Sequence, residues 1–359
     1  MTKQIPLAKP LIDRSVRRAV NRVLKSGNLA QGPEVLAFEK EFSNFVNDRE
    51  CVAVNSGTSA LHLALLSLGV GPGDEVIVPS FTFAATANSV ALTGATPVFV
   101  DIEPLTFNID PLKIVCAITA RTKAIQVVHL YGLPANMPEV MKIAEEYKLL
   151  VVEDAAQAHL ASIHNQPVAT FGDAAAFSFY PTKNMTSGEG GMIVFKNQSN
   201  ARYARLMRNQ GMEKRYQNEV VGFNLRMTDI HAAIGRQQLR KLSAWTKKRQ
   251  ENAALLSSKI NEVTTPHIPA DYSHVFHQYT IRVPRNRDAF SARLNEVGIG
   301  NGVYYPTQVH RLPSFSRELD LPETAKATAE VLSLPIHPSL SKRDLIRITD
   351  GVNRIAETI

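Results

Sequence analysis

The feature that most constrains the fold is a regular alternation of short apolar runs with helix-like segments over the first two-thirds of the chain. Strand-like runs such as EVIVPS (75–80) and TPVFVDI (96–102) alternate with helical patterns such as MPEVMKIAEEYK (137–148). Continuous apolar strands joined through helices are typical of a mainly parallel sheet that is covered on both faces. The sequence therefore predicts an α/β fold, with strands within 51–57, 75–80, 96–102, 123–132, 149–158, 172–181 and 190–197.

The pattern changes at Thr228, where a long helical stretch begins and runs to about residue 263. Thr228 is a suitable N-cap, and Asp229 is favoured in a first turn by the helix dipole. Shorter strand and helix patterns follow, at 277–284, 287–299 and 342–359. We expect a large domain over residues 1–245, which includes the N-terminal segment, and a smaller α+β domain over residues 246–359.

Charge and cysteine content narrow the class of protein. The chain of 359 residues carries a net charge of +7, but its basic residues are scattered, and the densest groups lie in helix-like segments. Solvated helix faces explain them better than a nucleic-acid surface. Cys51 and Cys116 lack metal-type spacing, which favours a reducing compartment. No apolar run approaches the ~20 residues that span a bilayer. We predict a soluble cytoplasmic protein with no nucleic-acid or membrane partner.

Histidines offer no metal site by their spacing. His159, His164, His274 and His277 are scattered or loosely spaced, and we identify no third ligand for the last two. We interpret them as structural or surface residues. No metal is therefore predicted.

Polar residues follow two of the predicted strands. Ser56, Gly57 and Thr58 lie between a strand and a helix, where free N–H groups and the helix dipole suit a phosphate, although plain helix capping is the alternative. Asp154 ends a buried strand, and a buried acid requires a partner. In one interpretation Asp154 caps a helix or forms a salt bridge, and in the other it pairs with a protonated ring nitrogen.

A lysine stands in an unusual place in SFYPTKNMTSGEGG (178–191). Lys183 lies between an apolar run and a glycine-rich turn. Taken alone, it would be an ordinary surface lysine, but a partly desolvated lysine can act as a nucleophile or base. A phosphate cradle, a carboxylate and a lysine, all at strand ends, are together what pyridoxal 5'-phosphate requires.

These motifs carry a family resemblance over nearly the whole chain. SGNLAQGPEVLAFEKEF, NSGTSALHLAL, GDEVIVPSFTFAATANSV, TKAIQVVHLYG, VVEDAAQAH, SFYPTKNMTSGEGGMI, GFNLRMTDIHAAIGRQQL and VLSLPIHPSL occur in order. The chain resembles the DegT/DnrJ/EryC1/StrS sugar aminotransferases, which are fold-type I pyridoxal phosphate enzymes. The resemblance implies a large cofactor-binding domain and a cofactor that passes through its pyridoxamine 5'-phosphate form during turnover.

The resemblance also implies roles around the cofactor ring. Lys183 would form the Schiff base and then move a proton between the substrate carbon and the cofactor. Asp154 would pair with the pyridinium nitrogen, and Gln157 would lie near the phenolic oxygen. Phe83 would stack on one ring face, although a core position is its alternative.

Other residues are implied at the phosphate. Gly57, Thr58 and Ser178 would hold it, and Asn224 would reach it from a second subunit, although Asn224 could instead be a turn residue. The cross-subunit role implies a homodimer with shared active sites. Two departures from the family pattern, Leu160 where glycine is common and Tyr180 where histidine or phenylalanine is common, could alter substrate fit without removing a catalytic group.

The resemblance favours transamination of a keto sugar on a nucleotide diphosphate, with glutamate or glutamine as amino donor. GEGG (188–191) favours C4 over C3, because many C3 relatives carry GDGG. Amination of a cyclitol or another non-nucleotide ketone is the alternative. Dehydrating relatives replace the lysine with histidine, so Lys183 opposes that activity. The intact Lys183, Asp154 and phosphate loop also oppose a non-enzymatic regulator.

Overall fold

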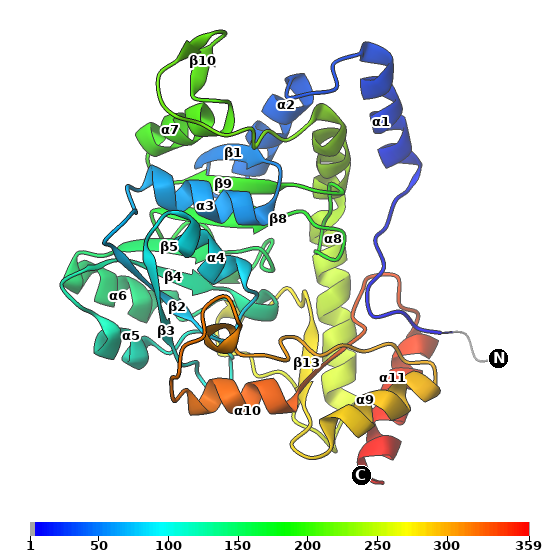
Figure 1. Cartoon of the computed structure of the whole chain (residues 1–359). Coiled ribbons are helices and arrows are strands. Elements are labelled where there is room, and N and C mark those ends of the chain that lie inside the picture. The colour runs from blue at the N-terminus through cyan, green and yellow to red at the C-terminus, as the bar shows by residue number, and fades with distance from the viewer. Residues whose placement is uncertain (1–3, 359) are drawn as a thin grey trace.

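The centre of the molecule is a twisted sheet. In the computed structural model, which describes residues 4–358, seven strands form this sheet in the order β1-β9-β8-β5-β4-β2-β3 (Figure 1). Their bounds are Glu50–Val54 (β1), Glu75–Pro79 (β2), Thr96–Val100 (β3), Thr122–Val128 (β4), Leu150–Asp154 (β5), Ala174–Ser178 (β8) and Gly191–Phe195 (β9). Only β9 runs against its neighbours, and the remaining pairs are parallel. The predicted mainly parallel sheet is confirmed.

Helices cover both faces of the sheet. Alternate residues of β2 separate the faces, since Val76 and Val78 enter one apolar cluster and Ile77 enters another. One face is covered by α3 (Gly57–Ser67), α4 (Ala85–Leu92) and α7 (Gln198–Arg208). The other face is covered by α2 (Pro33–Ser43), α5 (Pro111–Ala117), α6 (Met137–Tyr147) and α8 (Asp229–Lys259). The near-continuous apolar character of the strands follows from this double burial.

The helix α8 has 31 residues and runs along most of the molecule (Figure 1). Thr228 caps it as predicted, because its hydroxyl accepts a hydrogen bond from the N–H of His231 at 3.3 Å. Asp229 has a further role, since its buried carboxylate accepts from the N–H groups of Gly32 and Val35, at 2.9 and 3.0 Å, and so caps α2. The domain boundary that we predict at residue 245 falls inside this helix, and the division stays a prediction.

The C-terminal third forms its own apolar core against the second half of α8. It contains the antiparallel pair β13 (Tyr279–Arg282) and β14 (Val331–Leu334), with α9 (Arg287–Glu296), α10 (Pro322–Glu330) and α11 (Lys342–Ala356). Ile5 joins this core and donates its N–H to the carbonyl of Gly298 at 2.9 Å. A separate helix, α1 (Arg14–Ser26), packs along α8.

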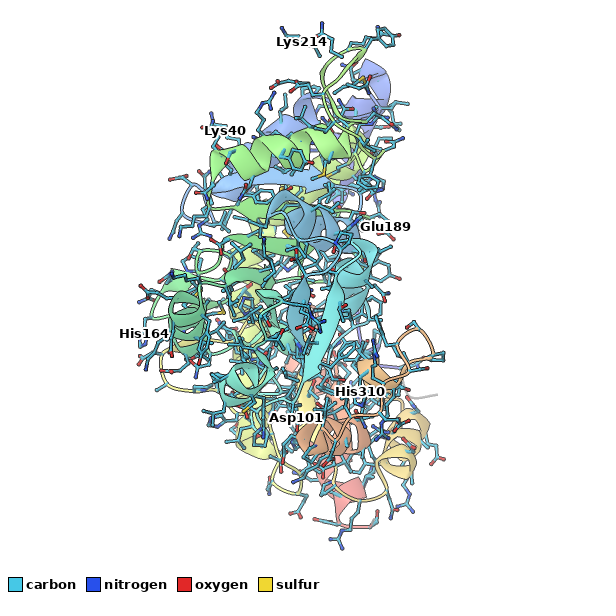
Figure 2. All side chains as sticks on the ribbon, turned by 60° about the vertical axis from the view of Figure 1, so that its left-hand side comes forward. Lys40, Asp101, His164, Glu189, Lys214 and His310 are labelled. Carbon is cyan, nitrogen blue, oxygen red and sulfur yellow. The ribbon has the colours of Figure 1, made fainter. Side chains whose placement is uncertain are left out.

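A long irregular segment, 301–321, ties the C-terminal third to the edge where β2 and β3 end. Asp101, which follows β3, and His310, which belongs to this segment, lie near each other and close to α10 (Figure 2). The carboxylate of Asp101 accepts from the N–H of Thr324 at 2.7 Å and so caps α10. His310 Nδ1 is 2.7 Å from the hydroxyl of Ser80. These contacts bring residues 301–310 over the carboxyl edge of the sheet.

Smaller elements complete the chain. These are β6 (Ser162–Ile163), β7 (Gln166–Pro167), β12 (Tyr272–Ser273), β10 (Met212–Lys214) and β11 (Gln217–Asn218), with single 3₁₀ turns at Leu130–Gly132 and Val309–Arg311. Cys51 is a buried free thiol and Cys116 an exposed one. Within residues 4–358, no helix has the length and apolar content to cross a bilayer. The same residues contain no group of three or more His, Cys, Asp or Glu side chains able to hold a metal ion.

Candidate active site

The predicted site residues gather at the carboxyl edge of the sheet. Gly57 begins α3 shortly after β1, and Phe83 follows β2. Asp154 is the last residue of β5, Ser178 is the last residue of β8, and Lys183 lies in the loop from β8 to β9. Parallel strands end at one edge, which is where open α/β sheets bind ligands. The fold therefore brings together side chains that lie far apart in sequence.

The start of α3 forms a cradle against the end of β8. A Cβ atom added to Gly57 would lie 2.7 Å from the Cβ of Ser178, so a side chain at Gly57 would not fit. Ser56 caps the helix by accepting from the N–H of Ser59 at 3.1 Å, and Thr58 lies half-buried in the first turn. An anion at this position would meet unpaired N–H groups and the positive end of the helix dipole.

Asp154 is a buried carboxylate that lacks an ion-pair partner among the described residues. Only 6% of the residue is exposed. Its oxygens accept hydrogen bonds from the Thr86 hydroxyl at 2.9 Å and from the N–H of Ala156 at 3.2 Å. Burial raises the pKa of this carboxyl, and the hydrogen bonds and the nearby charge of Lys183 oppose that rise. A protonated ring nitrogen beside Asp154 would stabilise the ionised form.

Lys183 is partly buried, and burial lowers its pKa to about 8, while the charge of Asp154 opposes the shift. Among residues 4–358, no hydrogen-bond acceptor is paired with its amino group, which leaves that group available for reaction. The loop around it is fixed from both sides: the Lys183 N–H donates to the carbonyl of Tyr180 at 2.9 Å, and Asn184 donates to the carbonyl of Val275 at 3.0 Å. A desolvated lysine on a fixed loop is suited to attack an aldehyde.

Gln157 has a fixed amide orientation. Its Oε1 accepts from the N–H of Tyr131 at 2.7 Å, so Nε2 must be the end that donates to the hydroxyl of Tyr305 at 2.8 Å. Tyr305 was not predicted as a site residue. It comes from the irregular segment 301–321, and no local pattern in the sequence indicates where that segment packs.

Phe83 lies at the rim of the site and is 60% exposed, so the alternative that it is a core residue is wrong. Its ring centroid is 6.2 Å from that of Tyr305, with a tilt of 37°. An exposed aromatic face beside a polar site offers a surface on which a flat ring can stack. Tyr180, one of the two departures from the family pattern, is also on the surface, with 49% of the residue exposed.

Asn224 is not joined to the other predicted phosphate ligands by a hydrogen bond within the described part of the chain. It is exposed, and its backbone pairs with Asn209 in an isolated bridge. The next residue, Leu225, accepts from the N–H of Asn55 at 2.9 Å, which places this segment beside the end of β1. Its role at the phosphate stays a prediction.

Leu160 has a backbone conformation that explains why glycine is common at this position. Its φ is +70°, in the left-handed region that costs a non-glycine residue about 1 kcal/mol or more. The side chain packs against the apolar core beneath α8, together with Phe42 and Leu242. Burial of this side chain offsets part of the backbone strain.

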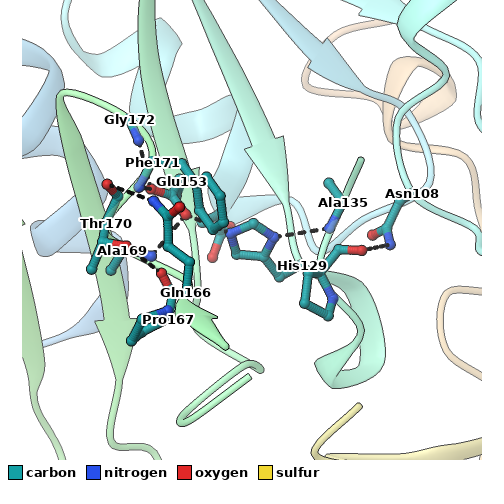
Figure 3. A network of polar contacts seen from close by, with 12 residues as sticks. Asn108, His129, Ala135, Glu153, Gln166, Pro167, Ala169, Thr170, Phe171 and Gly172 are labelled. Atoms are coloured by element: carbon teal, nitrogen blue, oxygen red, sulfur yellow. Dashed lines mark hydrogen bonds and ion pairs between the residues drawn. The ribbon is translucent and has the colours of Figure 1, made fainter. Parts of the chain in front are cut away.

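A buried polar network supports β5 through Glu153 (Figure 3). Because successive side chains of a strand point to opposite faces, this network lies on the other face of the sheet from Asp154. The carboxylate of Glu153, which is fully buried, accepts from His129 Nε2 at 3.0 Å and from the N–H groups of Ala169, Phe171 and Gly172 at 2.7, 3.0 and 2.8 Å. One anion thus joins β4, β5 and the loop that leads into β8. Sequence reasoning missed this pair, although a glutamate within a buried strand is itself a signal that a partner exists.

The same network fixes the tautomer of His129. Its Nδ1 accepts from the N–H of Ala135 at 3.0 Å, so the ring proton is assigned to Nε2 and is donated to Glu153. The His129 N–H donates to the carbonyl of Asp154 at 3.0 Å. The position of the Asp154 backbone is therefore set by β4 as well as by its own strand.

Together these residues fit pyridoxal phosphate. The glycine cradle suits its phosphate, the desolvated carboxylate suits its ring nitrogen, the lowered pKa of Lys183 suits its aldehyde, and the exposed ring of Phe83 suits its face. The donor set required for this cofactor is present at one edge of one sheet.

Comparisons with known proteins agree with this site. The sequence profile of the DegT/DnrJ/EryC1/StrS aminotransferase family matches residues 10–353. A GDP-perosamine synthase from Caulobacter vibrioides is 39% identical over 98% of both chains. A pleiotropic regulatory protein from Geobacillus stearothermophilus is 40% identical over 99% of this chain and 96% of its own.

Solved structures extend the agreement to three dimensions. The S. venezuelae enzyme DesV, crystallised with a ketimine intermediate, superposes with a TM-score of 0.95 at 38% identity over the full length of both chains. The predicted fold class, cofactor and enzyme class are thereby confirmed. This chain belongs to the DegT/DnrJ/EryC1/StrS family and is a fold-type I, pyridoxal phosphate-dependent sugar aminotransferase.

Proposed function

We propose that the protein aminates a keto sugar carried on a nucleotide diphosphate, at C4, with glutamate or glutamine as the amino donor. The observation that carries the reaction type is the presence of a desolvated lysine and a buried carboxylate at the sheet edge that also carries the Gly57 cradle. The similarity to GDP-perosamine synthase supports a nucleotide-linked sugar. Glu189 in GEGG supports C4, and the net charge of +7 is compatible with a diphosphate.

The bound cofactor supplies an electron sink that stabilises negative charge on the carbon that loses a proton. Lys183 Nζ holds the cofactor, takes the proton from the carbon that bears the donor's amino group, and returns a proton at the sugar carbon that gains it. Asp154 keeps the ring nitrogen protonated, because its buried carboxylate is stabilised by a neighbouring cation.

The remaining residues bind and orient. Gly57, Thr58 and Ser178 hold the phosphate at the start of α3, Phe83 stacks on the ring, and Gln157 donates its second Nε2 hydrogen to the phenolic oxygen. Support comes from the close approach of Gly57 to Ser178, the exposed face of Phe83 and the fixed amide of Gln157.

The protein is further proposed to be a cytoplasmic homodimer in which each Asn224 reaches the phosphate of the partner subunit. Apolar side chains near Asn224 are unusually exposed: Val221 is 92% exposed, and Tyr216 is 79% exposed. Tyr216 lies on the β10–β11 hairpin, which projects from the body of the molecule (Figure 1). Grouped exposed apolar residues favour a protein interface, and a two-fold interface would present this segment to both sites.

Subunit complementation tests the shared site. Lys183→Ala and Asn224→Ala chains, each inactive alone, are mixed under conditions where subunit exchange is verified with differently tagged chains. Some mixed dimers then carry one site with both defects and one intact site, so activity returns in proportion to the mixed dimers. Two inactive parents that exchange without regaining activity would place Asn224 in its own chain's site.

A substrate panel tests the reaction. The protein is incubated with 4-keto and 3-keto nucleotide sugars and with a cyclitol ketone, each with glutamate or glutamine, and the products are read by mass spectrometry. We expect an amino product from the 4-keto nucleotide sugar and none from Lys183→Ala. A product from the cyclitol ketone alone would replace the proposed substrate class by the alternative.

A further inference from the structure

The phenol of Tyr305 has no assigned role, although it lies against residues proposed to hold the cofactor. Its hydroxyl oxygen is 2.8 Å from Gln157 Nε2, and its ring centroid is 6.2 Å from that of Phe83. The charge of Asp154 also acts on this phenol. Tyr305 therefore lies close to Gln157, Phe83 and Asp154, three of the residues predicted to surround the cofactor ring.

Counting donors and acceptors leaves two hydrogens unused, one on the Tyr305 hydroxyl and one on Gln157 Nε2. The Gln157 amide is oriented by the Tyr131 N–H, so Nε2 is the donor and the Tyr305 oxygen is the acceptor in their shared bond. The phenolic O–H must then point elsewhere, and no acceptor for it exists among the described residues. Gln157 Nε2 likewise has a second hydrogen to give. Two unused donors thus come from adjacent atoms.

The surroundings keep Tyr305 in its protonated form. The residue is half-buried, and its ring contacts Phe81 and Phe83 at centroid distances of 6.0 and 6.2 Å. Burial raises the pKa of the phenol well above its ordinary value, and the Gln157 hydrogen bond offsets only part of that rise. The phenol is therefore protonated near neutral pH, where it acts as a hydrogen-bond donor and not as a base.

We propose that Tyr305 donates a hydrogen bond to a ligand oxygen that lies beside Gln157 in the active site. This rests on the proposed function, because the acceptor is either the phenolic oxygen of the cofactor or an oxygen of the sugar bound over it. Either acceptor would receive two donors, one from a strand-end residue and one from the segment 301–321. Tyr305 would thus be the contribution of the C-terminal third to the reacting centre.

The test compares Tyr305→Phe with the neighbouring Tyr304→Phe. Each change removes one hydroxyl and keeps the ring, and the Tyr304 contact that ties this segment to Tyr131 is made by a backbone carbonyl, which the control retains. Two quantities are measured: the pH midpoint of the visible absorbance of the cofactor-loaded protein, and KM for the keto sugar with kcat. Circular dichroism and thermal midpoints verify that both variants fold.

If the acceptor is the cofactor oxygen, Tyr305→Phe raises the absorbance midpoint by about one pH unit, because a donor that favours the anionic oxygen is lost. If the acceptor belongs to the sugar, the midpoint stays and KM rises about tenfold. Tyr304→Phe changes neither quantity. A coloured wild-type protein whose Tyr305→Phe variant matches it in both quantities overturns this inference alone. A colourless wild-type protein overturns the proposed function and this inference with it.

A double variant separates direct donation from mere support of Gln157. If Tyr305 only holds the amide, Gln157→Leu combined with Tyr305→Phe behaves as Gln157→Leu does alone. If Tyr305 itself donates to the ligand, the combined variant shows a further shift in the midpoint or in KM. Identical values for the single Gln157→Leu variant and the combined variant would refute direct donation.

Discussion

The neutral fraction of Lys183 in the cofactor-free protein can be worked out from its surroundings and then measured. Burial lowers the pKa of this amine to about 8. At pH 7 about one-tenth of the molecules then carry an uncharged amine, against roughly 0.03% for a lysine with an ordinary pKa near 10.5. The neutral, reactive fraction of Lys183 at pH 7 should therefore be about 300 times that of a lysine with the ordinary pKa.

The contribution of Asp154 to this pKa has a definite sign. Burial lowers the pKa of Lys183, whereas the charge of Asp154 raises it. Asp154→Asn removes only the second effect, so the pKa must fall below the wild-type value. The size of this fall measures the free energy with which the Asp154 charge stabilises the ammonium form of Lys183, at about 1.4 kcal/mol per pH unit.

Competitive acetylation measures the prediction directly. Cofactor-free wild-type and Asp154→Asn proteins are labelled with trace acetic anhydride from pH 6 to pH 11, and labelling at Lys183 is read by peptide mass spectrometry. The exposed Lys214 reports the reagent delivered at each pH. A wild-type midpoint at 10 or above would refute the desolvation argument. A midpoint that rises in Asp154→Asn would refute the assigned sign.

Three further predictions follow from close contacts and buried charges. Gly57→Ala should weaken cofactor binding tenfold or more in an absorbance titration, since its Cβ would lie 2.7 Å from that of Ser178. The control Gly71→Ala should bind normally, because the only neighbour of its added Cβ is the carbonyl oxygen of Thr93 at 4.0 Å. Glu153→Gln should lower the free energy of unfolding in urea by about 3 kcal/mol, because the amide cannot accept all of the hydrogen bonds that the carboxylate accepts; a loss under 0.5 kcal/mol would contradict this. In the cofactor-free protein, Lys183→Met should be about 3 kcal/mol more stable than wild type at pH 7, because the folded state pays to keep an ammonium whose pKa burial lowers from 10.5 to about 8. This gap should close from pH 8 to 10.5, since the unfolded chain binds more protons than the folded one there; a constant gap would exclude a buried ammonium.

The sheet was predictable because its signals are local. Each strand is a short apolar run, and every strand end is followed by a turn or a helix pattern, so the order of elements and the edge that carries the polar residues follow from the sequence. The cap of α8 was predictable for the same reason, since Thr228 and the N–H that it accepts from lie three residues apart. The cap of α2 was not, because it comes from Asp229, 197 residues beyond Gly32.

The candidate site divides in the same way. Gly57, Asp154 and Lys183 stand in motifs at strand ends, and each residue type matches one chemical need of the cofactor. Tyr305 lies in an irregular segment and meets Gln157 across 148 residues, so its place depends on the path of the whole C-terminal third. The partner of Glu153 is likewise fixed by strand order, because β4 and β5 are adjacent in the sheet.

The reversal of β9 has a consequence for the order in which this protein folds. Strands β8 and β9 form a hairpin, and the loop that holds Lys183 is closed by the Phe179 N–H donating to the carbonyl of Gly190 at 2.9 Å. Closing so short a loop costs little chain entropy, and such contacts form early. The strands that carry the cradle and the carboxylate also precede residue 196, so we expect this hairpin to form while the C-terminal third is still being synthesised. The Asn184–Val275 contact that completes the Lys183 loop, and Tyr305, are added afterwards.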